Sequence, residues 1–209
     1  MRVAMLGAGN VGKALASSLV GAGHEVVITA SKLENARAAA EAAGAEAADS
    51  NRDAVERADV VVLAVPYRTA ETVVRELGDS IAGKIVVDVI NRVNLEDPAS
   101  FLDGTSAAEQ IQSWAPEARV VKALNYAFAV RMSDPSVDGV ATDGFVAAND
   151  EEAKRTVLEL VGAIGFRPVD AGPLGMSRAL EALAMLNMVA QMRNGWSWQT
   201  GFRLVGPTS

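Results

Sequence analysis

The sequence contains no cysteine and only one histidine in 209 residues. Without cysteine, the chain cannot form a disulfide, bind a metal through thiolates or use a thiol as a nucleophile. A single histidine excludes a metal site built from several histidines of one chain. The lack of cysteine agrees with a reducing compartment, and we expect a cytoplasmic protein without a metal site.

Excess positive charge and long apolar runs are absent as well. The formal net charge is −7, so a nucleic-acid partner is not expected. No apolar run approaches the length of a membrane-spanning helix, and VVVLAV at 60–65 ends at Pro66, so we expect no membrane partner. Hydrophobic residues make up 50% of the chain and charged residues 22%, proportions typical of a globular protein.

Short apolar runs alternate with amphipathic segments along the first 172 residues. Val11, Leu15 and Leu19, for example, share one face of a helix between the first two runs. Most runs are apolar at every position, which is typical of strands in a parallel sheet covered on both faces. The chain is therefore predicted to be α/β, with a Rossmann-like doubly wound parallel sheet. The expected strands are 2–6, 25–29, 58–65, 84–90, 119–125, 144–149 and 167–172.

The pattern changes after residue 173. The segment MSRALEALAMLNMVAQMRN at 176–194 has no glycine or proline and is apolar around much of its circumference. We expect a single domain over 1–209, with an α/β core at 1–172 and a C-terminal helical extension at 173–209. The long helix is expected to pack on the sheet or on a partner subunit. Because one sheet covers only one side of a helix, we expect a homodimer.

A glycine-rich turn follows the first predicted strand and opens the first helix. Gly7, Gly9 and Gly12 give the spacing G-x-G-x-x-G. Gly7 permits a tight turn, Gly9 lets the backbone approach a pyrophosphate, and Gly12 lets the helix pack against the strand. The backbone amides that follow, including those of Asn10 and Val11, would point at the phosphates. In this β-α-β context the motif predicts dinucleotide binding.

The second strand ends in ITASK at 28–32, where an NAD-binding protein usually has an acid that binds the ribose hydroxyls. Thr29, Ser31 and Lys32 offer two hydroxyls and a cation instead. An acid there would repel the additional phosphate of NADP, whereas a hydroxyl and an ammonium bind it. The alternative is that Ser31 caps the next helix and Lys32 is simply solvated. The missing acid favours NADP.

Several segments together resemble one known family. They are LGAGNVGKALASSLVGAGHEVVI, the Ser-Lys pair, VVLAVPY, SAAEQI, ARVVKALN and DAGPLGMSRALEALA. With these segments the chain resembles the coenzyme F420-dependent NADP oxidoreductases (NADPH-dependent F420 reductases) over nearly its whole length. The motifs KALN at 122–125 and DAGPL…SR..E at 170–181 are more specific than the glycine turn, which many dehydrogenases share.

The resemblance implies hydride transfer between NADP(H) and a deazaflavin, coenzyme F420, bound beside the nicotinamide. It places the glycine turn on the pyrophosphate, the Ser-Lys pair on the ribose phosphate, the segment 64–66 along the ribose, Asn91 near the nicotinamide and Asn125 at the pocket floor. The expected cofactor-binding residues are Gly7, Gly9, Asn10, Val11, Thr29, Ser31, Lys32, Ala64, Val65, Pro66 and Asn91, and the expected substrate-binding residue is Asn125. Hydride transfer needs two ring carbons held about 3–3.5 Å apart, and no catalytic acid or base is assigned.

Two other functions stay open. One is a related NADPH-dependent reductase whose small-molecule redox substrate is a flavin, a quinone, an imine or a ferric complex. The other is a module that senses NADP(H) without catalysis. The polar loops 91–105 and 131–143 are either pocket walls or ordinary surface loops.

Several single residues also carry expectations. Lys122, in the middle of a predicted strand, is expected to be structural. Asp170 and Glu181 are expected to pair with Arg178 or another cation. Tyr126 belongs to the segment YAFAV, which is a candidate wall of the substrate pocket.

Overall fold

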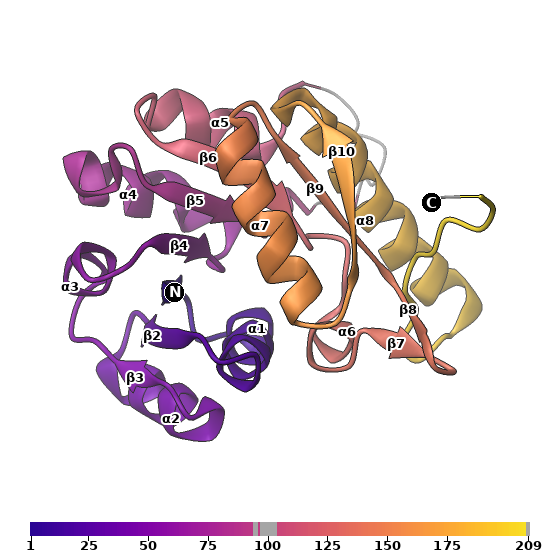
Figure 1. Ribbon diagram of the computed structural model, residues 1–209, viewed down its shortest axis with the longest axis horizontal. Coiled ribbons are helices and arrows are strands. Elements are labelled where there is room, and N and C mark those ends of the chain that lie inside the picture. The colour runs from indigo at the N-terminus through magenta and orange to yellow at the C-terminus, as the bar shows by residue number, and fades with distance from the viewer. Residues whose placement is uncertain (94–95, 97–103, 208–209) are drawn as a thin grey trace.

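The computed structural model describes residues 1–93, 96 and 104–207. Among them, eight strands form one sheet in the order β10-β9-β6-β5-β4-β1-β2-β3 (Figure 1). The strands are β1 (Arg2–Leu6), β2 (Glu25–Thr29), β3 (Glu46–Ala47), β4 (Val60–Leu63), β5 (Ile85–Asp88), β6 (Arg119–Ala123), β9 (Asp143–Ala148) and β10 (Arg167–Gly172).

Six strands run parallel, as the sequence predicted, but the last two do not. β9 pairs with β6 in the antiparallel direction, with Val121 opposite Ala148, and β10 runs parallel to β9. The expectation of an all-parallel sheet is therefore wrong at this end, because a buried strand has the same apolar pattern in either direction. We call the edge at which β1, β2, β4, β5 and β6 end the carboxyl edge. β9 begins at this edge instead of ending there.

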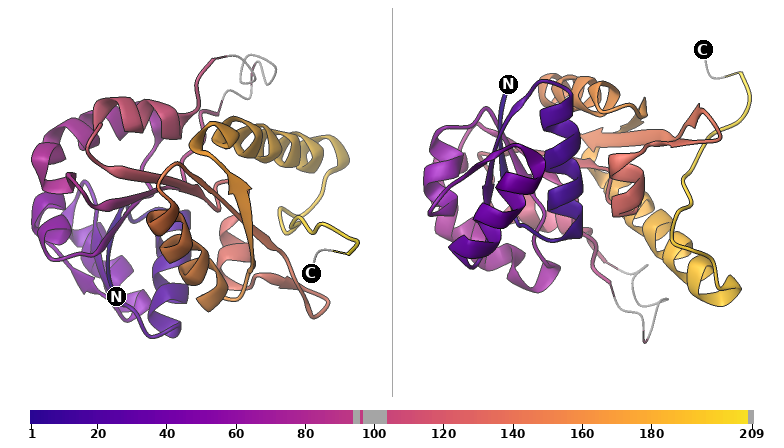
Figure 2. Two further views of the ribbon diagram at one scale, coloured as in Figure 1. Left: turned by 45° about the horizontal axis from the view of Figure 1, so that its top comes forward. Right: turned by 90° about the horizontal axis from the view of Figure 1, so that it is seen from below.

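Helices cover both faces of the sheet, which confirms the doubly wound prediction. In β1, Val3 and Met5 face one hydrophobic cluster, while Ala4 and Leu6 face the other. Figure 2 shows α7 and α8 on opposite sides of β9 and β10. The first face carries α1 (Asn10–Gly21), α2 (Leu33–Ala43), α6 (Ala129–Ser133) and α7 (Glu151–Ala163), and the second carries α3 (Asn51–Glu56), α4 (Tyr67–Leu77), α5 (Ala107–Trp114) and α8 (Ser177–Asn194).

Most helix ends follow local sequence signals. The Ser106 hydroxyl accepts from the backbone N–H of Glu109, and the Glu109 carboxylate accepts from the N–H of Ser106, so α5 starts with a capping box. The Asp150 side chain caps α7 in a similar way. α2 ends where Gly44 takes a left-handed φ of 70°. The described residues also contain two short 3-10 turns, η1 (Gly78–Ile81) and η3 (Leu174–Met176).

The long C-terminal helix α8 packs on the sheet with one face. Leu180 and Ala184 contact a cluster that includes Tyr126 and Ala147. The opposite face remains open to solvent, and Leu186 is 62% exposed. Of the two expected placements, packing on the sheet is thus confirmed for one side of the helix.

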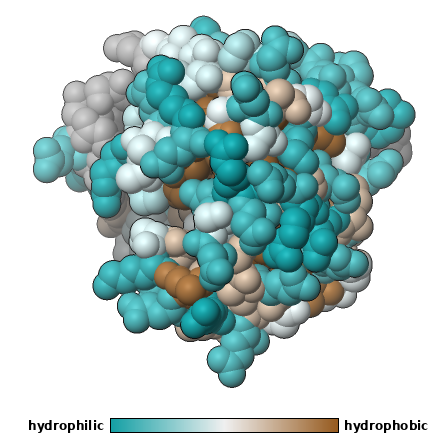
Figure 3. Space-filling model, turned by 90° about the vertical axis from the view of Figure 1, so that its left-hand side faces the viewer, coloured by the Kyte–Doolittle hydropathy of each residue, from teal (hydrophilic) through white to brown (hydrophobic). Residues whose placement is uncertain are grey.

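Two surface features complete the fold. The predicted loop 131–143 contains the end of α6 and a small hairpin of β7 (Ser136–Val137) and β8 (Val140–Ala141), which pair apart from the main sheet. The loop 91–105 lies largely outside the described residues. Figure 3 shows the side of the molecule that is on the left in Figure 1, and hydrophobic residues appear there only as small, separate patches in a hydrophilic surface.

Candidate functional site

The glycine turn joins β1 to α1 where β4 passes close by. Gly7 has a φ of 121°, and its N–H donates to the carbonyl of Thr29 at 3.0 Å. A Cβ at Gly7 would lie 2.2 Å from the carbonyl oxygen of Ala64, and a Cβ at Gly12 would lie 1.9 Å from that of Gly7. Both positions therefore require glycine, since any side chain would push apart the backbones that meet at the carboxyl edge.

Gly9 differs from the other two glycines, because a Cβ there would meet no atom within 4 Å. Gly9 is also the N-cap of α1, with φ −74° and ψ −175°, and no side chain caps the helix within the described part of the chain. The first turn contains no acidic residue. Open space therefore faces uncapped backbone amides at a helix N-terminus, an arrangement that fits the pyrophosphate of a dinucleotide.

The end of β2 leaves Ser31 and Lys32 exposed. Lys32, not Ser31, is the N-cap of α2, so the alternative role of Ser31 as a helix cap is wrong. The Lys32 side chain is 70% exposed, and its Nζ lies 3.8 Å from Glu34 Oε1. Thr29 is buried, and its hydroxyl donates to Asn51 Oδ1 at 2.6 Å. The Thr29 carbonyl thus accepts from the glycine turn, while Ser31 and Lys32 are open to solvent.

Ala64, Val65 and Pro66 follow β4 at the same edge. The Ala64 N–H donates to the carbonyl of Leu6 at 2.9 Å, and Pro66 is the N-cap of α4. Because the Ala64 carbonyl lies against Gly7, the fold brings these three residues beside the glycine turn, as the sequence suggested.

Asn91 and Asn125 also meet at the carboxyl edge, just beyond the neighbouring strands β5 and β6. Asn91 Nδ2 donates to the backbone carbonyl of Asn125 at 2.6 Å, and Asn125 Nδ2 donates to Asn91 Oδ1 at 2.7 Å. Asn125 Nδ2 donates to the carbonyl of Leu180 in α8 as well, at 3.0 Å. We call these two side chains the asparagine pair.

The turn that leads to Asn125 has unusual backbone geometry. Leu124 has a φ of 56°, in the left-handed region that a leucine rarely adopts, and its side chain is buried. Asn125 is only 5% exposed, and its Oδ1 has no hydrogen-bond partner among the described residues. The asparagine pair therefore contains one buried acceptor oxygen without a hydrogen-bond partner among the described residues.

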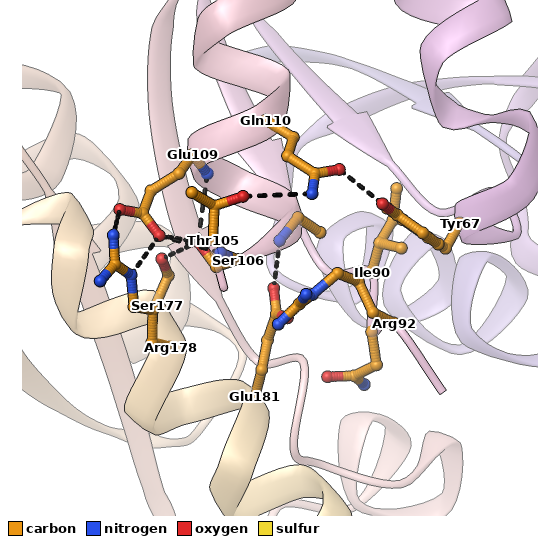
Figure 4. A network of polar contacts seen from close by, with 12 residues as sticks. Tyr67, Ile90, Arg92, Thr105, Ser106, Glu109, Gln110, Ser177, Arg178 and Glu181 are labelled. Carbon is orange, nitrogen blue, oxygen red and sulfur yellow. Dashed lines mark hydrogen bonds and ion pairs between the residues drawn. The ribbon is translucent and has the colours of Figure 1, made fainter. Parts of the chain in front are cut away.

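Four ionisable side chains lie directly beneath the asparagine pair, and we call them the charge cluster: Asp88, Arg92, Lys122 and Glu181. Lys122 Nζ donates to Asp88 Oδ2 and to Glu181 Oε1, both at 2.9 Å, and three of these side chains are fully buried. Arg92 Nε donates to Glu181 Oε2 at 3.1 Å (Figure 4). Burial raises the pKa of Asp88, and the neighbouring ammonium of Lys122 opposes this rise.

A second polar network joins the start of α5 to α8. Both side-chain nitrogens of Arg178 that face Glu109 donate to its carboxylate, at 2.8 and 2.6 Å (Figure 4). This contact, reinforced by donors of Ser106, lowers the pKa of Glu109 to about 2. The Ser106 and Ser177 hydroxyls lie 2.5 Å apart and close the network.

Several sequence expectations can now be compared with these contacts. Lys122 is fully buried and pairs with Asp88 and Glu181, which agrees with the expected placement inside the fold. Glu181 does pair with a cation, but that cation is Lys122 or Arg92 and not Arg178, and Asp170 pairs with Lys154 at 3.3 Å. Tyr126 is not a pocket wall: it is buried, and its hydroxyl donates to the carbonyl of Asp143 at 2.6 Å. The charge cluster was not predicted, although an aspartate and a lysine within apolar strands were a usable signal.

Two further observations concern other kinds of site. In the part of the chain that the structure describes, no three His, Cys, Asp or Glu side chains gather as a possible metal site. Within the same residues, no helix combines the length and apolar composition needed to cross a membrane.

Comparison with known proteins identifies the family. The family model described as "NADP oxidoreductase coenzyme F420-dependent" matches residues 2–92. The chain is 34% identical over 204 residues to the F420-dependent NADP reductase of Methanocaldococcus jannaschii, and the match covers 89% of this chain and 90% of that relative. It is also 33% identical over 184 residues to metalloreductase STEAP3 of Rattus norvegicus, a match that covers 88% of this chain but only 36% of that protein.

A solved structure agrees with this result. The crystal structure of a candidate F420-dependent NADP reductase from Arthrobacter sp. FB24 is 28% identical, covers 99% of this chain and all of its own, and has a TM-score of 0.86. Because the sequence match to the Methanocaldococcus protein spans nearly the whole of both chains, this chain belongs to the family of coenzyme F420-dependent NADP oxidoreductases.

Proposed function

We propose that this protein is an NADP-dependent oxidoreductase that transfers a hydride between NADP(H) and the deazaflavin coenzyme F420. The observation that carries the proposal is the 34% identity to an F420-dependent NADP reductase over 89% of the chain. The geometry of the carboxyl edge supports it, because it provides for a dinucleotide with an additional phosphate. The whole chain acts as a single NADP-binding domain, with a core at 1–172 and an extension at 173–209.

The cofactor lies along the carboxyl edge from β2 to β5. The amides at the start of α1 bind the pyrophosphate against Gly9, and Ser31 and Lys32 bind the ribose phosphate. Asn91 lies near the nicotinamide, and Asn125 contacts the second substrate. The proposed cofactor residues are Gly7, Gly9, Asn10, Val11, Thr29, Ser31, Lys32, Ala64, Val65, Pro66 and Asn91.

The protein contributes position and exclusion of water more than acid–base chemistry. The nicotinamide supplies or accepts the hydride, and the deazaflavin is the other substrate. Transfer of this kind needs two flat rings in contact and a dry site. The carboxyl edge provides buried polar groups in the asparagine pair, and the apolar residues Ala64, Val65 and Pro66 lie at the same edge. Reduction of the deazaflavin also takes up one proton at a ring nitrogen; water supplies it, and no side chain is assigned as its donor.

The assembly that we propose is a homodimer formed through the exposed face of α8. Leu186 is 62% exposed and Met192 44%, and a helix with apolar residues on its solvent side is typical of a subunit interface. The expected location is the cytoplasm, as the lack of cysteine suggests.

The direct test mixes the purified protein with NADPH and the deazaflavin and follows the visible absorbance of the deazaflavin. We expect the deazaflavin to lose its visible absorbance without added metal, while the near-ultraviolet absorbance of NADPH also falls as NADPH is oxidised. Flavin mononucleotide, a quinone, a cyclic imine and a ferric chelate serve as parallel acceptors. No bleaching of the deazaflavin would contradict the proposal.

The similarity to STEAP3 gives the ferric chelate particular weight among these acceptors. If it alone were reduced rapidly, the protein would act as a reductase of that class. Tight NADPH binding without reduction of any acceptor would instead favour a sensor of NADP(H).

A further inference from the structure

Burying the charge cluster in the interior of this protein costs free energy of folding. Asp88, Lys122 and Glu181 are each 0% exposed. Removing three charges from water carries a large penalty, and apolar side chains of similar size often replace buried ion pairs without loss of stability. The stability of the fold is therefore a weak explanation for these residues, and the contacts that they make are more informative.

The charge cluster binds the chain on both sides of Asn91. The Ile90 carbonyl accepts from Lys122 Nζ at 2.5 Å, and the Ile90 N–H donates to Asp88 Oδ1 at 2.8 Å. On the other side, the Arg92 side chain is held by Glu181. Both neighbours of Asn91 are thus fixed by groups that belong to β5, β6 and α8.

The charge cluster also restrains Asn125 through helix α8. Asn125 Nδ2 donates to the carbonyl of Leu180, the residue just before Glu181 in α8. Glu181 Oε1 also accepts from the N–H of Ala107 at 2.8 Å, which fixes α8 against the start of α5. The left-handed Leu124 shows that the turn before Asn125 is held in a conformation that costs energy.

We infer that Lys122 and Glu181 are positioning residues for the proposed reaction. They hold the asparagine pair rigidly beside the rings that exchange the hydride. The inference rests on the proposed function only for the identity of those rings. Because Asn125 Nδ2 donates to two oxygens, the orientation of its side-chain amide is fixed.

The variant Glu181→Gln tests the positioning role with little disturbance. It keeps the shape of the side chain and leaves Lys122 paired with Asp88. The control is Glu109→Gln, which removes a more exposed ion pair between α5 and α8, where Glu109 makes no contact with the asparagine pair.

The first readout needs no cofactor. The side-chain amide protons of Asn91 and Asn125 are observed by ¹H–¹⁵N NMR of the free protein and assigned with single alanine variants. Their hydrogen exchange should be at least tenfold faster in Glu181→Gln and within twofold of the natural protein in Glu109→Gln. Unchanged exchange in a folded Glu181→Gln protein would overturn the positioning role, whether or not the deazaflavin is the substrate.

The second readout separates binding from turnover. In Glu181→Gln the kcat should fall about tenfold or more, while the dissociation constant for NADPH changes less than threefold. A weaker NADPH affinity with unchanged kcat would contradict the inference. Lys122→Met should show the same split more strongly, and if it does not fold, Glu181→Gln alone decides the matter.

Discussion

Replacing Gly9 with alanine should abolish tight NADPH binding while leaving the fold intact. Gly9 has φ −74° and ψ −175°, which alanine adopts without strain, and a Cβ there meets nothing within 4 Å. Alanine lowers the entropy of the unfolded chain but is a poorer N-cap than glycine, so the free energy of unfolding should change by less than about 1 kcal/mol. The added methyl group, however, occupies the space that we assign to the pyrophosphate.

Binding should weaken much more than stability changes. Forcing a methyl group into a filled site costs about 1–3 kcal/mol, which corresponds to roughly 5- to 150-fold in the dissociation constant for NADPH. Titration calorimetry measures this affinity, and denaturant unfolding of the free protein measures stability. If Gly9→Ala bound NADPH as tightly as the natural protein, the pyrophosphate would not lie against Gly9, and our assignment of the turn would be refuted.

Two other glycines of the same helix provide controls. Gly21 is the last residue of α1, and a Cβ there also meets nothing within 4 Å, so Gly21→Ala should raise stability without changing NADPH affinity. Gly12→Ala should instead destabilise the free protein, because its Cβ would lie 1.9 Å from the Gly7 carbonyl. The three variants make the same chemical change and differ only in what the methyl group meets.

Three further changes have expected outcomes. Lys32→Glu should weaken NADPH binding more than tenfold and NADH binding much less, since a charge-assisted phosphate contact is worth about 1.5–3 kcal/mol; equal losses in calorimetry would remove Lys32 from the phosphate site. The pKa of Glu109 is held at about 2 by Arg178, so the stability that this pair adds is present at neutral pH and is lost as the pH falls from about 5 toward 2. The free energy of unfolding should therefore fall less between pH 7 and pH 3 for Glu109→Gln than for the natural protein. Denaturant unfolding at both pH values measures this, and an equal fall in the two proteins would contradict it. Light scattering of the natural protein should give a mass near twice 21.8 kDa, and Leu186→Glu should give the single-chain mass; a monomer in both cases would rule out the proposed interface.

The sequence predicted most of the parallel half of the fold and the position of the candidate site. Strands such as Val60–Leu63 and Ile85–Asp88 lie in short apolar runs that begin after a polar residue, Asp59 or Lys84, and such runs are typical of buried strands. For these strands the local pattern determines the position directly. The family resemblance implied that Asn91 lies near the nicotinamide and Asn125 at the pocket floor, and the two side chains are hydrogen-bonded to each other.

Other features depend on which distant residues meet, and no local pattern contains that information. The antiparallel direction of β9 reflects its pairing with β6, and Tyr126 is buried because α8 covers it. The partners of Glu181 are 59 and 89 residues away in the sequence, so its position on a helix could not reveal them. Very short elements such as β3 were missed for another reason, since two residues give no periodicity.

The buried charges of Asp88, Lys122 and Glu181 also restrict how this sequence can evolve. Changing Lys122 alone to an apolar residue leaves two carboxylates facing each other in the interior, and changing either acid alone alters the charge balance of the other two. Single substitutions by apolar residues at these positions should therefore destabilise the fold even where a joint change to three apolar residues would fold. A library that varies all three codons together and is selected only for folded protein should return apolar combinations. The same library selected for reductase activity should return the charged set.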